Sequence, residues 1–359
     1  MTLLELESVE CRGTPRELGR AHGEALRSRI QAFVEQRRRA LSQYFAERDE
    51  VSRVGEFEAA GSACLEAARS WDPEGTAEHD GIAEGANLEP WLLYAFANMT
   101  DVRDVLLLPS APDREGCTSL LVPRNRAESQ RLLAAQTWDL NPDDLDFVVA
   151  IHRRPAEGPE TWSVTCAGAL SLVGMNAEGI AVGTTNIKTR ASRPGVGYLS
   201  ILHRAIRAAT RAEALGALRS APRAAAHTYW VADAAGAHEL ETDPSLIVER
   251  TLATEAIVQT NHCQAPELKS REGEAASSSS QRRLARARQL LSDTGIDRDA
   301  VRRLFEDRTD GVDSINRRPE DAQGTTTNAC VICIPESREL WACRGPADRG
   351  EWRQLSFAG

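Results

Sequence analysis

LLPSAPDREGCTSLLV, residues 107–122, is the stretch where the chain changes from one kind of secondary structure to another. The part up to Cys117 is rich in Pro, Asp and Gly, which predicts an exposed loop, and the part after it contains strand formers. Structural cysteines usually lie within buried apolar segments, whereas Cys117 follows Gly116 in this polar loop. Gly116 has no Cβ to hinder attack on its carbonyl carbon, and Thr118 and Ser119 supply hydroxyl groups nearby. The stretch therefore makes Cys117 a candidate nucleophile.

Helices are predicted before this stretch. Apolar residues recur at helical spacing in residues 15–43, 55–70 and 90–106. The segment HDGIAEGANLEP, residues 79–90, is interrupted by glycines, which predicts a non-helical connection. The first third of the chain is therefore expected to be mostly helical.

Strands are predicted after the stretch, in residues 118–189 and 227–260, with a helix between them at 199–219. The sequence Asn-Ala-Glu-Gly at 176–179 predicts a hairpin turn. A polar loop, a helix and a final hairpin are expected in that order at residues 264–280, 281–293 and 328–343. Helices followed by strands that alternate with helices indicate layered α+β or α/β packing.

Composition excludes several classes of function. The net charge of −10 is unfavourable for a protein that binds nucleic acid, and the basic runs Arg37–Arg39 and Arg282–Arg283 are expected on solvated helix faces. No stretch approaches the ~20 apolar residues of a membrane span, and the N-terminus lacks the pattern of a secretory signal. Eight cysteines in 359 residues do not form a disulfide framework, so we expect a reducing, cytoplasmic setting without nucleic-acid or membrane partners.

Neither a metal nor a cofactor is expected. Cys330 and Cys333 stand three residues apart on a predicted strand, so their side chains point to opposite faces. No second cysteine pair follows, and the seven histidines show no ligand spacing. The chain contains no phosphate loop or dinucleotide fingerprint. Acyl-coenzyme A is therefore considered only as a substrate.

Two predicted strands end in polar residues that suit catalysis. Asn261 and His262 follow one strand, and an Asn side chain can donate a hydrogen bond to a developing oxyanion. Asp139 ends another strand, with Thr137 close before it. Each of these residues is also a common turn residue. Cys117 and His262 are some 145 residues apart, a spacing that also fits a papain-type Cys–His pair, although papain-type cysteines begin a helix rather than a strand.

Several segments of the chain resemble, in the same order, the penicillin acyltransferase (isopenicillin N acyltransferase) family of autoproteolytic cysteine N-terminal-nucleophile hydrolases. The segments that carry the resemblance are Gly81–Ala86, Glu115–Ser119, Gln136–Asp139, Val173–Val182, Arg193–Pro194, Thr260–Cys263 and the series Ser280, Arg283 and Arg286. The resemblance implies an α+β fold, a four-layer αββα sandwich of the N-terminal-nucleophile hydrolase type. It also implies self-cleavage into a mostly helical subunit, residues 1–116, and a subunit of residues 117–359 that carries the active site, the two remaining associated as one folded unit.

The resemblance also assigns roles to individual residues. Cleavage between Gly116 and Cys117 would make Cys117 the nucleophile and its new α-amine the general base. Asn261 would be the oxyanion donor, and Asp139 would orient the new N-terminus or a bound substrate. The residues expected to support them are Thr118, Ser119, Thr137 and His262.

The function implied is an amidohydrolase or acyltransferase. It would form a Cys117 acyl-enzyme from a small-molecule amide or thioester and pass the acyl group to water or an amine. The sequence departs from the family at Thr137, where the family has Asn, and at Gln323, where the member acting on the penicillin nucleus has Arg. The second departure removes a cation that could hold a substrate carboxylate. The alternatives are a papain-like cysteine amidase that uses Cys117 and His262 without self-cleavage, and a non-catalytic binding protein on the same fold.

Overall fold

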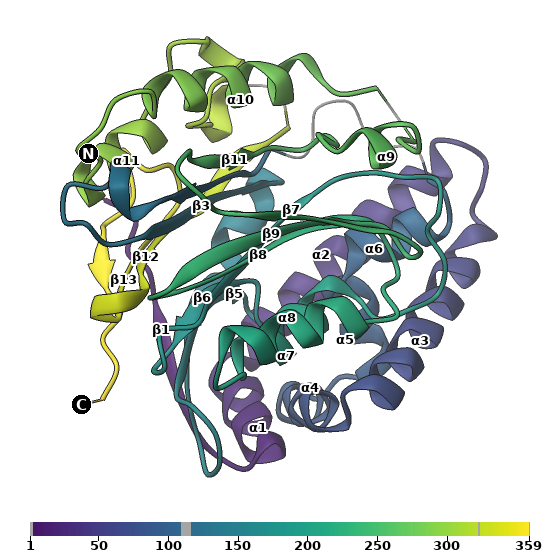
Figure 1. The fold of residues 1–359 in the computed structure, drawn as a ribbon. Coiled ribbons are helices and arrows are strands. Elements are labelled where there is room, and N and C mark those ends of the chain that lie inside the picture. The colour runs from purple at the N-terminus through teal and green to yellow at the C-terminus, as the bar shows by residue number, and fades with distance from the viewer. Residues whose placement is uncertain (1–2, 109–115, 274, 322–323, 359) are drawn as a thin grey trace.

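The computed structural model describes residues 3–108, 116–273, 275–321 and 324–358. Two β-sheets lie face to face, and helices cover the outer face of each (Figure 1). The sheets meet where β7 contacts β2 and β3 and where β6 contacts β12. This arrangement confirms the predicted α+β fold with four αββα layers.

The larger sheet has eight strands, in the order β1-β4-β5-β6-β7-β8-β9-β10. Its strands pair antiparallel, except that β1 lies parallel to β4. The turn predicted at residues 176–179 joins β6 to β7, and the Asn176 Oδ1 accepts backbone N–H groups from Glu178 and Ile180. The strands are β1 (Ser8–Gly13), β4 (Val148–Pro155), β5 (Thr161–Cys166), β6 (Val173–Asn176), β7 (Ala181–Asn186), β8 (His227–Asp233), β9 (Gly236–Thr242) and β10 (Ile247–Thr251).

The smaller sheet has six antiparallel strands, in the order β11-β2-β3-β12-β13-β14. Its strands are β11 (Ile257–Gln259), β2 (Thr118–Val122), β3 (Leu133–Leu140), β12 (Thr326–Ile334), β13 (Glu339–Arg344) and β14 (Arg353–Gln354). The strand that follows Cys117 therefore lies between the strand that precedes Asn261 and the strand that contains Asp139. Three residues that are far apart in the sequence are brought to neighbouring strands in this way.

Helices form the two outer layers. The larger sheet is covered by α1 (Pro15–Ala25), α2 (Arg27–Ala46), α3 (Arg53–Trp71), α4 (Pro73–Ala86), α5 (Pro90–Ala97), α6 (Met99–Val105), α7 (Tyr198–Ile206) and α8 (Arg211–Ser220) (Figure 1). The smaller sheet is covered by α10 (Ser278–Leu290) and α11 (Arg298–Phe305), and α9 (Pro266–Lys269) lies in the loop after β11. Across the described ranges, no helix combines the length and the apolar character needed to cross a membrane.

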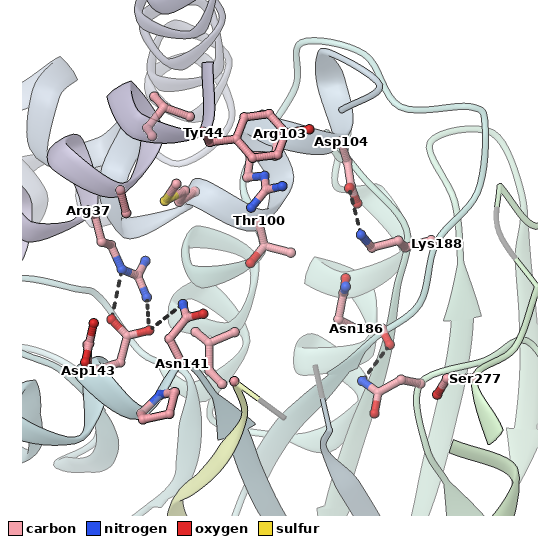
Figure 2. Close-up of a pocket in the computed structure, with 18 of the residues that line it drawn as sticks. Arg37, Tyr44, Thr100, Arg103, Asp104, Asn141, Asp143, Asn186, Lys188 and Ser277 are labelled. Carbon is pink, nitrogen blue, oxygen red and sulfur yellow. Dashed lines mark hydrogen bonds and ion pairs between the residues drawn. The ribbon is translucent and has the colours of Figure 1, made fainter. Parts of the chain in front are cut away.

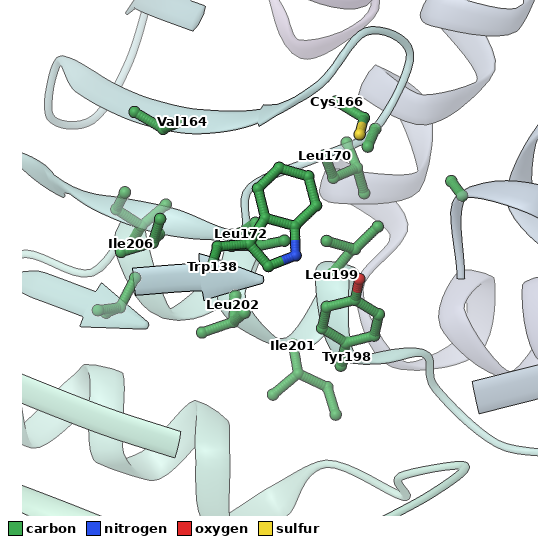
Figure 3. Packing of buried hydrophobic residues seen from close by; sticks show 14 of the residues in the cluster. Trp138, Val164, Cys166, Leu170, Leu172, Tyr198, Leu199, Ile201, Leu202 and Ile206 are labelled. Carbon is green, nitrogen blue, oxygen red and sulfur yellow. The ribbon is translucent and has the colours of Figure 1, made fainter. Parts of the chain in front are cut away.

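Alternation along β3 and β12 separates two apolar clusters. Figure 3 shows Trp138 of β3 beside Leu172, Leu199 and Tyr198, which belong to the same apolar cluster. The neighbouring Asp139 points to the opposite face of β3, because successive strand side chains alternate. Cys333 belongs to the same cluster as Trp138, whereas Cys330 belongs to the cluster under α10 and α11, so the two cysteines face opposite sides as predicted.

The predicted connection at residues 79–90 is wrong, because residues 73–86 form helix α4. The glycines in this segment serve close packing against α1 rather than a turn. A Cβ atom on Gly81 would lie 2.3 Å from the Arg16 carbonyl oxygen, and one on Gly85 would lie 2.5 Å from that of Arg20. The structure also adds strand β1, which the sequence analysis did not predict.

Candidate active site

The Gly116–Cys117 junction is buried at the start of β2. The Cys117 side chain is 7% exposed, and its Sγ lies 4.0 Å from the Asp139 carbonyl oxygen, which also accepts the Gly116 N–H at 3.4 Å. The predicted exposure is therefore wrong for these two residues, because β3 and α10 cover them. The remainder of the predicted loop, residues 109–115, lies outside the described residues.

Arg283 connects Cys117 to Asn261. Its Nη1 donates to the Cys117 carbonyl oxygen and, at 3.1 Å, to Thr118 Oγ1, while its Nη2 donates to Asn261 Oδ1 at 2.9 Å. The Asn261 Nδ2 donates to the Asn186 carbonyl oxygen at 3.0 Å. One planar guanidinium therefore fixes the distance between the candidate nucleophile and the candidate oxyanion donor.

The expectation that the basic runs lie on solvated faces is wrong for two of their members. Arg283 of α10 is fully buried, and Arg37 of α2 is buried in an ion pair with Asp144 at 2.9 Å. Burial and, to a smaller extent, the neighbouring Arg317 lower the pKa of Arg283 to about 9, while Asp139 acts in the opposite direction. The junction therefore lies beside a buried cation that is held by hydrogen bonds.

Arg317 is a second buried cation at the junction, and the sequence analysis did not select it. Its Nε lies 3.9 Å from Asp139 Oδ2, and its Nη2 donates to Ser279 Oγ. A Cβ atom on Gly116 would lie 2.9 Å from both the Arg317 guanidinium and the Asp139 carboxylate, so a larger residue would displace one of these side chains. The junction therefore has a guanidinium on each side, Arg317 next to Gly116 and Arg283 at the Cys117 carbonyl, and such groups can stabilise developing negative charge.

Asp139, Thr118 and Thr137 lie beside the junction, near the two buried arginines. Burial raises the pKa of Asp139 to about 6, while Arg317 and Arg283 lower it. Thr118 and Thr137 lie opposite each other on β2 and β3, and Thr137 Oγ1 accepts the Thr118 N–H at 3.1 Å. Ser119 is buried one residue further along β2. Of the four residues predicted around Cys117 on these two strands, Asp139, Thr118 and Thr137 therefore lie together at the junction, whereas the Ser119 side chain points to the other face of β2.

His262 lies on the α10 side of the loop after β11. Its Nδ1 is 2.7 Å from Ser280 Oγ and 3.3 Å from Thr260 Oγ1. Burial lowers the pKa of His262 to about 4, and Arg283 contributes to the same direction. An imidazole with so low a pKa is a weak base at neutral pH, which argues against the papain-like role.

A cavity of about 470 Å³ opens beside Asn261 and Asn186. Helices α2 and α6 form one wall, and loops that follow Asn186, Asn261 and Leu140 form the other (Figure 2). The first wall belongs to the segment before Gly116 and the second to the segment after it. Ion pairs join the two segments at this cavity, Arg37 with Asp144 and Lys188 with Asp104 at 3.9 Å.

The cavity is mixed in character. Apolar and aromatic side chains lie under α2, and charged side chains lie around α6 and the loop after β7. Gly324 also lines it, whereas Gln323, where the sequence departs from the penicillin-nucleus pattern, lies outside the described residues. The apolar and aromatic members are Ala40, Leu41, Tyr44, Met99 and Leu140, and the charged members include Arg103, Asp104, Lys188 and Glu272.

Comparison with known proteins gives the family. Residues 125–348 match the family described as acyl-coenzyme A:6-aminopenicillanic acid acyl-transferase. The chain belongs to this family. The resemblance inferred from the sequence is thereby confirmed, since these residues include the Asp139, Asn261 and Arg283 segments. A curated member, the 40 kDa form of acyl-coenzyme A:6-aminopenicillanic-acid-acyltransferase from Emericella nidulans, is 25% identical over 269 residues, which are 71% of this chain and 69% of the relative.

Solved structures in the comparison share less with this acyl-transferase family member. Penicillin V acylase from Agrobacterium tumefaciens is 14% identical with a TM-score of 0.43, over 64% of this chain and 82% of that one. A mutant of the conjugated bile acid hydrolase from Clostridium perfringens is 10% identical with a TM-score of 0.39, over 67% of this chain and 97% of that one.

Proposed function

We propose that the protein is an autoproteolytic N-terminal-cysteine amidohydrolase or acyltransferase. It would form a Cys117 acyl-enzyme from a small-molecule amide or thioester and pass the acyl group to water or an amine. The observation that carries the proposal is that Arg283 joins the Cys117 carbonyl to Asn261 in a chain of an acyl-transferring family. The name of the curated relative, an acyltransferase, is in accord with this chemistry.

Maturation would begin with attack of the Cys117 thiol on the Gly116 carbonyl carbon. The C–N bond between the two residues breaks, a thioester forms, and the thiol proton passes to the nitrogen. Water then hydrolyses the thioester, which leaves a carboxylate on Gly116 and a free thiol and α-amine on Cys117. Arg317 supports this step because its guanidinium lies next to Gly116 and can stabilise the oxyanion.

Turnover would use the groups that maturation creates. The free α-amine has a reference pKa of about 7.7–8.0, which suits a general base near neutral pH, and it resides on the nucleophile itself. Asn261 would donate to the oxyanion of the substrate, and Asp139 would hold the new ammonium or a substrate group. The substrate would occupy the 470 Å³ cavity, with its acyl chain against Leu41 and Met99.

The two fragments would remain together after cleavage. Strand β1 is paired with β4 within the larger sheet, and several buried polar contacts cross from the first segment to the second. Removing one partner of a buried ion pair is strongly unfavourable, so these contacts resist separation. The contacts are Arg37 with Asp144, Glu78 with Arg153 and Asp101 with both His227 and the Tyr198 N–H.

Self-cleavage tests the proposal directly. Freshly purified wild-type protein is expected to separate on a denaturing gel into fragments of residues 1–116 and 117–359. The masses of the two fragments should sum to the mass of the uncleaved chain plus one water. N-terminal sequencing of the larger fragment should begin Cys-Thr-Ser-Leu. An active preparation that remains one chain would overturn the proposal and favour the papain-like alternative.

His262 distinguishes the proposal from that alternative. In the matured enzyme, His262→Gln is expected to lower kcat by less than about tenfold, because the α-amine rather than the imidazole acts as the base and Gln can still bond to Ser280. Steady-state rates of matured wild type and variant give the comparison. Complete loss of turnover in a folded, cleaved His262→Gln protein would mean that the imidazole is the base.

A further inference from the structure

Side chains hold the backbone of the loop that carries Asn261. The N–H of Asn261 donates to Ser280 Oγ at 2.9 Å, and the carbonyl of His262 accepts from Gln259 Nε2 at 2.8 Å. Two carboxylates accept hydrogen bonds from the backbone N–H groups of the residues that follow His262. Glu272 Oε1 accepts the N–H of Cys263 at 2.7 Å, and the Glu241 carboxylate accepts those of Gln264 and Ala265 at 2.9 and 3.1 Å. The orientation of Asn261 therefore depends on residues outside the loop.

Glu272 differs from the other residues that hold this loop, because its own segment also pairs with the loop after β7. Its segment pairs with the loop after β7, through a bridge between Glu272 and Thr189 and through the Gly273 N–H, which donates to the Lys188 carbonyl at 3.2 Å. That loop follows Asn186, whose carbonyl oxygen accepts the Asn261 Nδ2. Glu272 thus connects the backbone next to Asn261 with the loop that follows Asn186, the residue that accepts the hydrogen bond of the Asn261 side chain.

We infer that Glu272 is a positioning residue for Asn261, an inference that rests on the proposed function. A carboxylate that accepts a backbone N–H makes a charge-assisted hydrogen bond, which is stronger than a bond between neutral groups. Without it, the loop after β11 and the loop after β7 lose their common attachment, and the Asn261 amide shifts relative to Cys117. A misplacement of about 1 Å in a reacting group can cost about 10²-fold in rate.

Glu272 also lines the cavity, so a direct contact with substrate has to be separated from positioning. Three variants achieve this. Glu272→Gln removes the charge but keeps an oxygen that can accept the Cys263 N–H. Glu272→Asp keeps the charge but shortens the side chain by one methylene, and Glu272→Met removes both charge and acceptor.

The measurement is kcat and KM of the matured proteins with the acyl-coenzyme A thioester or chromogenic anilide that the wild type turns over. We expect Glu272→Met and Glu272→Asp to lower kcat by about 10²-fold and to leave KM within about twofold, because the transition state alone needs the Asn261 donor. Glu272→Gln is expected to keep kcat within about threefold of wild type.

Asp297→Ala is the matched control. Asp297 Oδ1 accepts the Ala300 N–H at 2.6 Å at the start of α11 in the outer layer, so the variant loses the same kind of bond away from the site. It is expected to lower the melting temperature and to leave kcat unchanged.

Each other outcome is decisive. Wild-type kcat in Glu272→Met, or in Glu272→Asp if the Met variant does not fold, would overturn the positioning role. If Glu272→Gln raises KM and lowers kcat as much as Glu272→Met does, Glu272 contacts the substrate instead of positioning Asn261. If the wild-type protein shows no turnover, or if its turnover does not depend on Cys117, the proposed function itself is contradicted. That result is distinct from any comparison of the Glu272 variants.

Discussion

Cys117→Ala is expected to leave the protein as a single chain of 359 residues without detectable acyl turnover. No sulfur remains to attack the Gly116 carbonyl or a substrate carbonyl, so the variant can carry out neither self-cleavage nor turnover. The Cys117 side chain is almost fully buried, and a methyl group occupies its space without strain, so the fold should persist. A denaturing gel and a turnover assay on the same preparation measure the two losses together.

Cys117→Ser separates the two reactions. A hydroxyl can still undergo the acyl shift, but it is a poorer nucleophile when its pKa is unperturbed, so slow or partial cleavage and much weaker turnover are expected. Cys64→Ala is the control, because Cys64 is a buried cysteine within helix α3, remote from the junction, and its loss should affect neither reaction. Full activity in Cys117→Ala would refute the mechanism.

Asn261→Ala is expected to lower turnover by about 10²–10³-fold, the cost of one lost oxyanion donor, or about 3–4 kcal/mol in the barrier. The nucleophile and the α-amine are untouched, so the variant isolates the donor. Steady-state kinetics on cleaved protein give the value, and co-expression of the two fragments provides cleaved protein if the variant matures slowly.

Asn261→Asp distinguishes the donor from the Arg283 contact. An aspartate keeps an oxygen for the Arg283 guanidinium but has no N–H group for the oxyanion. If the donor matters, Asn261→Asp loses at least as much turnover as Asn261→Ala. Substantial activity in Asn261→Asp beside an inactive Asn261→Ala would instead assign Asn261 the task of anchoring Arg283.

The residues that strand pattern and motif resemblance could identify are those at the ends of strands. Cys117, Asp139 and Asn261 each lie at or next to such an end, where the sequence changes from apolar strand residues to polar ones. Their proximity follows from the order β11-β2-β3, which local patterns do not specify because it depends on pairing between distant segments. The family resemblance implied that these residues act together, through the roles that it assigns to them, but it did not give the order of the strands.

The burial of Arg283 and Arg317 could not be recognised from the sequence. Arg283 occurs in a helix rich in arginine, where a solvated face is the usual outcome, and only the fold shows that its own position points inward. Arg317 lies in a segment without regular structure, where no periodicity exists to indicate burial. Helix α4 was missed for a related reason. Its glycines allow close packing against α1, a contact that the local sequence does not reveal.

The groups around the Gly116–Cys117 bond are distributed widely along the chain. Asp139, Asn261, Arg283 and Arg317 are widely separated in the sequence, so the ribosome synthesises them at different times, and all of them after the bond itself. On the proposed mechanism, a nascent or truncated chain lacks the parts needed to cut itself. The cut would then act as a quality check, because only a polypeptide that has been synthesised through Arg317 and correctly assembled would become an active enzyme.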